Sequence, residues 1–504
     1  MSRTKEPFKG EIRVASRIVD YLSSGLYNSA AACLKELINN SFDADATRVE
    51  LFVMPDSERI IVADDGVGLS EPEFKQHFDR VSESHKRDGE GGDKTNSGRP
   101  KVGKIGIGFI AANELCDVME ISSTKEGSTE LMKVEINFVE MRQPPEKRKR
   151  SGSDYMKADY EGHIEKAPAA DHYTRVVLKQ IRPTAQGILV GARESRKHTH
   201  GELSIYGRKP AWIRDRISGA ADWSDFDEYS QTILQVGLNV PVRYLPRWYP
   251  DEHKPILGRF ERDVTKLGFE VHCDGSELRK PVVLDAGEAN LLRSVQIDGE
   301  HVSARGYFYA KRRALRPQWL NGVLIRIRNA AVGEYDATFM GFKSTEGRLF
   351  QSWISCELWA DDRLEEALNI DRRTLRVTHP AFVELQEKFH LEFSDFLGET
   401  REKLYSEPAA KRRRSEARAE IERFAAVIES PETALPPKVR EKLAGRAQRR
   451  AEPKRVSTQR DVRAVLRKYG VAELYELALD VARETLPHEQ YQKFAQALAE
   501  RLLR

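Results

Sequence analysis

The spacing of hydrophobic residues changes from a helical to a strand period within the first 70 residues of the chain. Leu34 and Leu37, with their apolar neighbours, fall on one side of a helical wheel, which predicts a helix over residues 28–42. Alternation of apolar and polar residues predicts a strand over 47–54. The apolar run at 59–70 predicts a second strand, which ends in an acidic turn with two glycines.

A long polar stretch then interrupts the pattern, from about Ser82 to Lys101. Its sequence, SESHKRDGEGGDKTNSGRPK, has almost nothing to bury, which predicts a mobile loop. The next segment, VGKIGIGFIAANELC (102–116), predicts a glycine turn that opens a buried helix. Further strands are expected at 131–141 and 173–181. Helices and strands therefore alternate, as in an α/β fold.

The 504 residues are too many for one hydrophobic core, so we expect several domains. The pattern predicts a first α/β domain over 1–205, with the polar loop as a lid at about 70–108. A second α/β domain, mostly of strands, is expected over 206–400, and a helical region over 401–504.

Composition excludes several classes of protein. The net charge of +3 is small, so any nucleic-acid surface would be a local patch. The four cysteines lie far apart without C-x-x-C spacing, which argues against structural zinc and disulfides and favours a reducing compartment. The start of the chain lacks the apolar run of a signal peptide, and no window approaches the roughly 20 apolar residues of a membrane span. We therefore expect a cytoplasmic protein without a membrane partner.

Polar residues gather along one stripe of the first predicted helix. Glu36 and Asn40 are four residues apart and Asp43 follows three later, so all three project from the same side. One interpretation is a solvated helix face. The other is a pocket in which Asn40 offers its amide oxygen to Mg²⁺, which commonly shares its ligands with substrate phosphates.

Two further motifs favour the pocket. In DDGVGL, Asp64 stands at a strand end and can accept a hydrogen bond from an exocyclic amine such as that of adenine, while Gly66 and Gly68 let the backbone approach a flat ring. The motif GKIGIGF can aim backbone N–H groups at phosphates. It is not a Rossmann fingerprint, because it follows a lid rather than the first strand of a βαβ unit. It is not a Walker A loop either, because no Lys-Ser or Lys-Thr follows its last glycine. Its glycines are Gly103, Gly106 and Gly108.

The order ELINNSFDADA, DDGVGL, VGKIGIGFIAA, with a lid between the second and third motifs, resembles the signature of the GHKL ATPases. This superfamily contains gyrase B, the ninety-kilodalton heat-shock chaperones, histidine kinases and MutL. The resemblance covers residues 15 to about 182. It implies a Bergerat-type α/β sandwich, a transducer-like middle domain, and hydrolysis of ATP to ADP and phosphate with Mg²⁺.

The resemblance also implies a role for individual residues. Glu36 would be the general base that activates water, and Asn40 the Mg²⁺ ligand. Asp43 would support the ribose and adenine side, and Asp64 would bind the adenine amine. The fourth motif of the family is a threonine, here Thr174, although Tyr173 replaces the usual glycine before it. The glycines implied are Gly66 and Gly68 for the adenine wall, and Gly103, Gly106 and Gly108 for the phosphate cradle.

Several cations are also expected to reach the phosphates. Lys86 in the lid and Lys104 just after it are predicted to contact the phosphates directly, and Lys104 is predicted to be a catalytic residue. The segment EEALNIDRRTLR resembles the catalytic loop of the heat-shock chaperone middle domain, which implies that Arg372 reaches the γ-phosphate, with Arg373 as its alternative. MutL and MORC proteins use a lysine there, and Lys343 is the possible counterpart.

By the same resemblance, ATP would close the lid and pair two chains as a homodimer. We expect a MORC- or MutL-like clamp or a regulatory ATPase, with DNA or another protein as partner. The alternative is a heat-shock-type chaperone that acts on protein clients. The basic run KRRR (411–414) is interspersed with glutamates nearby, which favours a salt-bridged helix surface. His198 and His200 lack a third metal ligand in the sequence.

Overall fold

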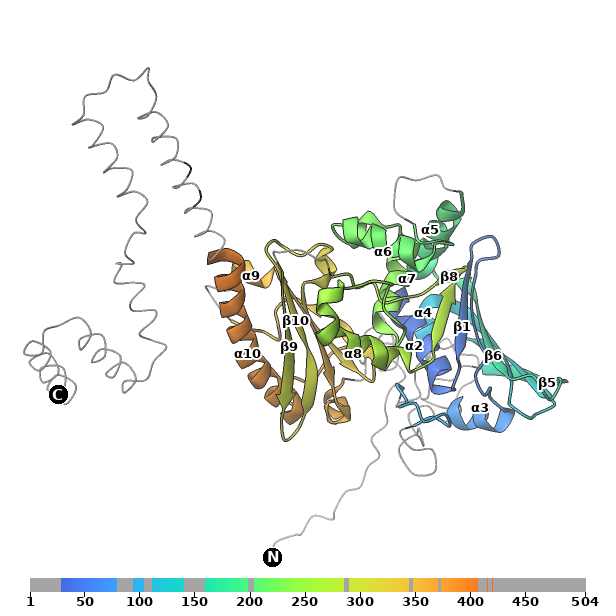
Figure 1. The fold of residues 1–504 in the computed structure, drawn as a ribbon. Coiled ribbons are helices and arrows are strands. Elements are labelled where there is room, and N and C mark those ends of the chain that lie inside the picture. The colour runs from blue at the N-terminus through green and yellow to red at the C-terminus, as the bar shows by residue number, and fades with distance from the viewer. Residues whose placement is uncertain are drawn as a thin grey trace, which may run out of the picture. The chain divides into compact units, whose positions relative to one another are not determined.

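The computed structural model divides the chain into two units, Met1–Ser406 and Glu407–Arg504, and every element below belongs to the first (Figure 1). In the second unit only positions 415 and 419 are described, so the helical region predicted for 401–504 lies almost entirely outside the described residues. Within the first unit the structure describes residues 29–78, 94–103, 111–139, 159–197, 204–284, 290–343, 348–369 and 373–406.

The first sheet contains eight strands in the order β5-β4-β3-β6-β2-β1-β7-β8. Neighbouring strands are antiparallel, except that β7 runs parallel to β1. Exposed and buried residues alternate along β1, which places one face of the sheet on the core. The strands are β1 (Arg48–Met54), β2 (Arg59–Asp64), β3 (Cys116–Thr124), β4 (Glu130–Asn137), β5 (Asp159–Lys166), β6 (Tyr173–Ile181), β7 (Glu270–Cys273) and β8 (Ser276–Glu277).

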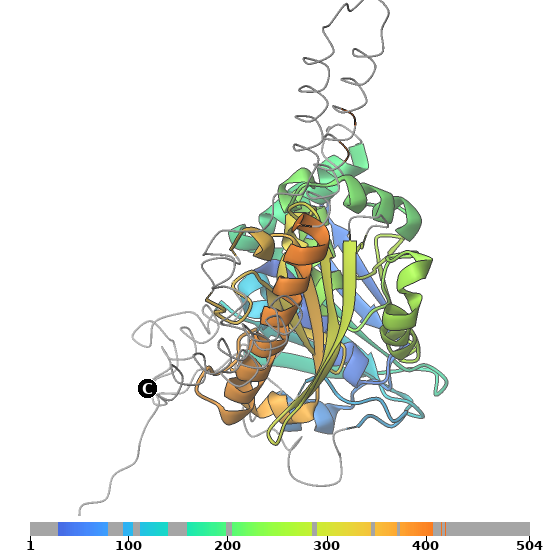
Figure 2. The ribbon, with the colours of Figure 1, turned by 60° about the vertical axis from the view of Figure 1, so that its left-hand side comes forward.

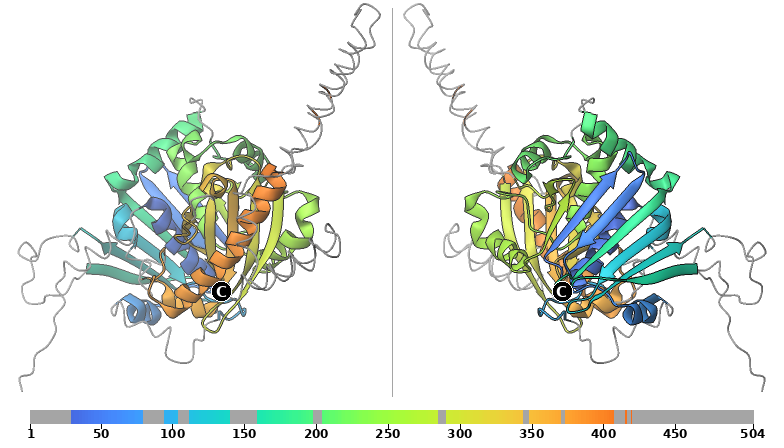
Figure 3. Two further views of the ribbon diagram at one scale, coloured as in Figure 1. Left: turned by 90° about the vertical axis from the view of Figure 1, so that its left-hand side faces the viewer. Right: turned by 90° about the vertical axis from the view of Figure 1, so that its right-hand side faces the viewer.

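Helices cover the buried face of this sheet, which Figure 3 shows from both sides. Helix α2 (Ala30–Asp43) begins at Ser29, whose Oγ accepts a 3.3 Å hydrogen bond from the N–H of Ala32 and so caps the helix. Its apolar residues pack in one core with β1 and β2. The other helices of this part are α3 (Glu71–Phe78), α4 (Ala112–Leu115), α5 (Gln186–Lys197), α6 (Pro210–Gly219), α7 (Glu228–Asn239) and α8 (Lys254–Thr265).

The second sheet contains five strands in the order β12-β11-β13-β10-β9, and α10 (Pro380–Thr400) lies across it (Figure 2). Aromatic rings fill the space between them: Phe308 of β10 stacks on Phe396 of α10 with ring centroids 4.9 Å apart. The strands are β9 (Asn290–Asp298), β10 (Ser303–Lys311), β11 (Gly322–Ile327), β12 (Ala330–Asp336) and β13 (Ile354–Ala360), and short helices are α9 (Arg348–Gln351) and η8 (Asp362–Ala367).

A buried ion pair joins the second sheet to the helices of the first. The guanidinium of Arg326 on β11 and the carboxylate of Glu357 on β13 lie 2.5 Å apart, and both side chains are fully buried. Arg326 also donates to the carbonyl of Leu238 on α7 (2.9 Å), and the Tyr244 hydroxyl donates to Glu357 (2.6 Å). Since α7 contacts both α2 and β12, the second sheet is placed directly beside the polar helix.

The predicted α/β class and sandwich are confirmed. The boundary predicted near residue 205 falls inside the stretch that builds the first sheet, because Glu270 of β7 pairs with Arg48 of β1. The change of sheet lies between Glu277 and Asn290. The division into three separate domains stays a prediction. Among the described residues, no helix is both long and apolar enough to cross a membrane.

Candidate functional site

Several polar residues of α2 are buried rather than solvated: Lys35, Glu36, Asn39 and Ser41 are each at most 9% exposed. Of the predicted stripe of Glu36, Asn40 and Asp43, Glu36 is buried and Asp43 is half-buried, so a solvated face does not describe Glu36. Asn40, in contrast, is exposed between buried neighbours. Burial of polar side chains is costly unless a partner compensates it, so this helix face is built to meet other groups.

Asp64 is held at the end of β2 by two hydrogen bonds. The Ser41 hydroxyl donates to one carboxylate oxygen (2.7 Å), and the N–H of Gly66 donates to the other (3.0 Å). Burial raises the pKa of the Asp64 carboxyl to about 6, and these hydrogen bonds only partly oppose that shift. At neutral pH the half-buried Asp64 carboxyl is therefore mostly ionised, and it acts as a hydrogen-bond acceptor.

Thr174 lies directly beside Asp64, because the two residues are register partners across β2 and β6. Its hydroxyl is 2.9 Å from the hydroxyl of Ser123 on β3. Ser123 also accepts a 2.8 Å hydrogen bond from the N–H of Leu69, in the turn after Asp64. The structure thus brings Asp64 of the second motif and Thr174 of the fourth to one place, together with Ser41 from α2 and Ser123 from β3, which sequence reasoning had not assigned to the site.

Gly66 and Gly68 are required by the packing of the chain itself. A Cβ on Gly66 would lie 2.7 Å from the carbonyl oxygen of Ala44. Gly68 has a φ of +73°, and a Cβ there would lie 1.9 Å from the carbonyl oxygen of Thr124. The backbone of this turn therefore lies against the end of α2, and its role as an adenine wall stays a prediction.

The acids at the end of α2 bind residues 94–103, which we call the strap. The two carboxylate oxygens of Asp43 accept hydrogen bonds from the backbone N–H groups of Val102 (2.6 Å) and Gly103 (2.7 Å). Asp45 accepts a 3.0 Å hydrogen bond from the N–H of Ser97 and lies 3.5 Å from Arg99. Burial favours a higher pKa for Asp45, but hydrogen bonds from the strap outweigh it and lower the pKa. Sequence reasoning gave Asp45 no role.

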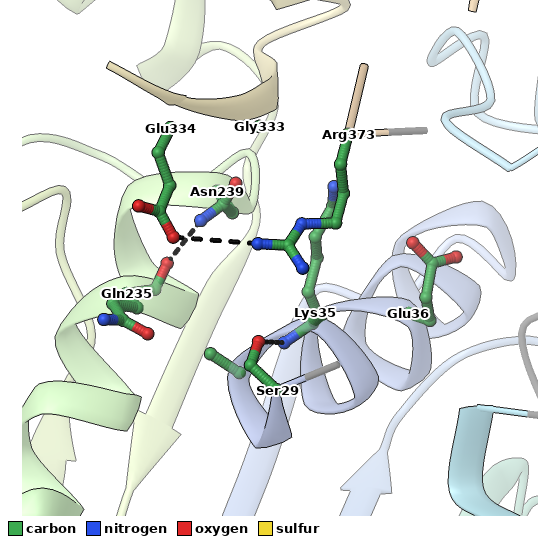
Figure 4. Close-up of a pocket in the computed structure, with 10 residues that line it drawn as sticks. Ser29, Lys35, Glu36, Gln235, Asn239, Gly333, Glu334 and Arg373 are labelled. Atoms are coloured by element: carbon green, nitrogen blue, oxygen red, sulfur yellow. Dashed lines mark hydrogen bonds and ion pairs between the residues drawn. The ribbon is translucent and has the colours of Figure 1, made fainter. Parts of the chain in front are cut away.

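A small pocket lies between α2 and the second sheet (Figure 4). Glu36 and Arg373 both line it, and its volume of about 20 Å³ is room for roughly one water molecule. Figure 4 shows the Arg373 guanidinium directed at Glu334, 3.7 Å away, and not at Glu36. The other lining residues are Ser29, Ala31, Ala32 and Lys35 near or on α2, Gln235 and Asn239 on α7, and Gly333 on β12.

Several predicted residues cannot be placed in this site. Lys343 is described but does not line the pocket of Glu36. The others lie outside the described residues, and their roles stay predictions: Lys86, Lys104, Gly106, Gly108 and Arg372, and the pair His198 and His200.

The geometry defines a class first: an α/β sandwich in which one polar helix, α2, holds the strand-end acid Asp64 through Ser41 and presents the buried carboxylate of Glu36 to the second sheet. Comparison with known proteins then supplies the family. Residues 27–161 match the model of the family described as Histidine kinase-, DNA gyrase B-, and HSP90-like ATPase. This part of the chain belongs to the GHKL ATPase superfamily, which confirms the resemblance.

The chain is also similar to individual relatives over parts of their length. It is 31% identical over 117 residues to the putative type II restriction enzyme HgiDII of Herpetosiphon aurantiacus, which covers 23% of this chain and 18% of that protein. The chaperone protein HtpG of Bacillus subtilis is 26% identical over 149 residues, covering 26% and 23%. HtpG of Methylorubrum extorquens PA1 is 25% identical over 241 residues, covering 42% and 37%. The chain thus spans about a fifth of the length of the first two relatives.

Proposed function

We propose that this protein binds ATP with Mg²⁺ and hydrolyses it to ADP and phosphate, and that ATP-driven closing and dimerisation make it a switch of the MORC- or MutL-like clamp or regulatory kind. The observation that carries this proposal is the position of α2. One end of the helix holds Asp64 through Ser41, and five residues earlier Glu36 meets the second sheet. Five helical residues span about 7.5 Å, a separation that suits a nucleotide laid along the helix.

The adenine side is supported by Asp64 and its neighbours. An ionised Asp64 would accept a hydrogen bond from the exocyclic amine of adenine, with Ser41 and Gly66 fixing the carboxylate in place. Thr174 and Ser123 offer hydroxyl groups beside it. Asn40 fits the magnesium ligand, since its side chain is exposed on a helix that is otherwise largely buried. Bound Mg²⁺ would neutralise charge on the phosphates.

The hydrolytic side is supported by Glu36. A buried carboxylate beside a space for about one water molecule matches a general base that orients and deprotonates the attacking water. Arg373 faces the same pocket from the side of the second sheet, where it lies beside Glu334. Once the Arg373 guanidinium leaves Glu334, this cation from the second domain can stabilise charge on the phosphoryl group. Hydrolysis would then depend on the position of that domain.

A heat-shock-type chaperone is the second candidate. It is favoured by the match to HtpG of M. extorquens, which at 241 residues extends well beyond the 135-residue span 27–161 of the ATPase family model. A chaperone would be stimulated by unfolded protein and a clamp by DNA, so the two functions predict different activators.

One experiment tests the proposal and separates the candidates. ATP turnover is measured with the chain alone, with duplex DNA and with an unfolded protein, while the mass in solution is followed with a non-hydrolysable ATP analogue. We expect turnover, a doubling of mass with the analogue, and stimulation by DNA at low salt that fades as salt rises. Stimulation by unfolded protein alone would support the chaperone. No turnover under any condition would contradict the proposed ATPase.

A further inference from the structure

The strap forms a tight turn whose shape is fixed by its own backbone. The N–H of Thr95 donates to the carbonyl of Arg99 (2.8 Å), and the N–H of Gly98 donates to that of Thr95 (3.0 Å). On one side the strap is bound by Asp43 and Asp45, as described above. This side attaches the start of the glycine motif to α2.

The other side of the strap is bound by Arg328 from the second sheet. Its guanidinium donates to the carbonyl oxygen of Lys101, and it also donates to Asp362 (2.8 Å) and lies 3.3 Å from Glu365. Only 4% of the Arg328 side chain is exposed. The Arg328 guanidinium therefore links the strap to helix η8. Arg328 and Lys101 are 227 residues apart in sequence.

The backbone at Arg328 suggests that its side chain is needed there. Arg328 and Asn329 form the two-residue turn between β11 and β12, with φ of +52° and +66°. Such turns favour Asn-Gly, and an arginine whose backbone adopts the left-handed conformation costs about 1 kcal/mol or more. The turn is kept in place because Trp359 donates to the Asn329 side chain (3.0 Å) and the buried Lys280 donates to its carbonyl (3.4 Å). A strained residue held this firmly points to a role for its side chain.

Backbone contacts tie the end of helix η8 to the neighbour of Arg373. Leu368 pairs with Leu375, and the N–H of Asn369 donates to the carbonyl of Thr374 (3.0 Å). The carbonyl of Arg373 in turn lies so near Gly333 that a Cβ there would be 2.4 Å away. The position of Arg373 at the pocket of Glu36 is therefore set by η8 and β12.

We propose that Arg328 is a positioning residue that couples the strap to the turn carrying Arg373. Through it, the start of the glycine motif at Gly103 and the cation facing Glu36 are held in one arrangement. The effect on turnover rests on the proposed ATPase function, whereas the physical coupling does not. A chain of contacts alone is not evidence of coupling, so the link must be measured.

The test is hydrogen exchange of the full-length protein without nucleotide. In Arg328→Gly, which removes the side chain and relieves the backbone, amides of residues 94–103 and of the turn around Arg373 should exchange about tenfold faster than in the wild type. Arg328→Lys keeps a charge near Glu365 but lacks the planar fork, so the strap amides should be faster there too. Arg328→Lys replaces Arg328→Gly in the test if the glycine variant does not fold.

Arg363→Ala is the matched control. Arg363 is on the same helix η8, yet its guanidinium binds Asp361, Ser303 and the carbonyls of Gly299 and Glu300, away from the strap. Its loss should leave exchange in the strap unchanged. If the strap amides exchanged as fast in Arg363→Ala as in Arg328→Gly, the cause would be a general loosening of η8, and the inference would be overturned.

ATP turnover supplies the second readout. Arg328→Gly should lower kcat about tenfold and change nucleotide affinity little, because Asp64 and its partners are untouched. Wild-type exchange in the strap of the folded Arg328 variants would overturn the coupling while leaving the ATPase proposal intact. Conversely, an inactive wild-type chain with a strap that still depends on Arg328 would reject the ATPase proposal alone.

Discussion

The Ser41 hydroxyl donates a 2.7 Å hydrogen bond to the carboxylate of Asp64, and so ties the last turn of the polar helix α2 to the end of strand β2. The hydrogen bond stabilises the ionised form of Asp64 in a place where burial disfavours it. Ser41 therefore belongs to the proposed adenine side of the site, although sequence reasoning assigned it no role there.

Replacing Ser41 should shift the pH dependence of ATP binding. Binding needs ionised Asp64, so wild-type affinity should fall as pH drops through the Asp64 pKa of about 6. In Ser41→Ala the stabilising hydrogen bond is lost, the pKa of Asp64 rises further, and affinity should fall already at a higher pH. Titration calorimetry from pH 5 to 8 measures both midpoints. Coincident midpoints would show that Ser41 does not act on Asp64.

Asp64→Asn should weaken ATP binding while making the nucleotide-free protein more stable at neutral pH. The folded pKa of about 6 exceeds the ordinary 3.8, so the native state binds more protons between these values. The free energy of unfolding contributed by Asp64 therefore falls as pH rises from about 4 to 6, and the full cost, at most about 3 kcal/mol, remains above that range. The variant avoids this cost.

Thermal unfolding at two pH values checks the sign. The melting temperature of Asp64→Asn should exceed that of the wild type at pH 7, and the difference should shrink toward pH 4, where the folded Asp64 carboxyl is protonated and most of the cost is gone. A variant less stable at pH 7 than at pH 4, relative to the wild type, would mean that burial does not dominate at Asp64.

The strands that could be predicted are those with a strong apolar pattern. β1 alternates between buried and more exposed positions, and β2 and β6 each contain an apolar run; they lie within the strands expected at 47–54, 59–70 and 173–181. β7 lies within the range 206–400 that was predicted as the second domain. Its pairing with β1 joins distant parts of the chain, and local periodicity contains no information about which strands pair.

The site was predictable where a motif marked it. Glu36, Asp64 and Thr174 were all marked by motifs; the structure pairs Asp64 with Thr174 and places Glu36 at a separate small pocket. Ser41 and Ser123, in contrast, act through tertiary hydrogen bonds that no spacing reveals. The same holds for larger separations: Asp45 binds Ser97 and Arg328 binds the strap only because the fold brings them together.

Gly68 should be far less tolerant of alanine than Gly127, which has nearly the same backbone conformation. Gly68 has φ +73° and a Cβ position 1.9 Å from the Thr124 carbonyl, whereas Gly127 has φ +77° and open space around it. Gly127→Ala should cost about 1 kcal/mol for the backbone alone, and Gly68→Ala several times more. Chemical denaturation of both variants measures the difference. Equal losses would mean that the turn at Gly68 is free to move away from β3.

The central claim, that Glu36 is the general base of an ATPase, is tested most directly by Glu36→Gln. Glutamine keeps the size of the side chain and its ability to orient water but cannot accept a proton. ATP affinity and turnover are measured for this variant beside the wild type and Asp64→Asn. We predict that Glu36→Gln binds ATP within about threefold of the wild type and loses at least about a hundredfold in turnover, whereas Asp64→Asn loses affinity. Turnover of Glu36→Gln at a rate comparable to that of the wild type would contradict the account.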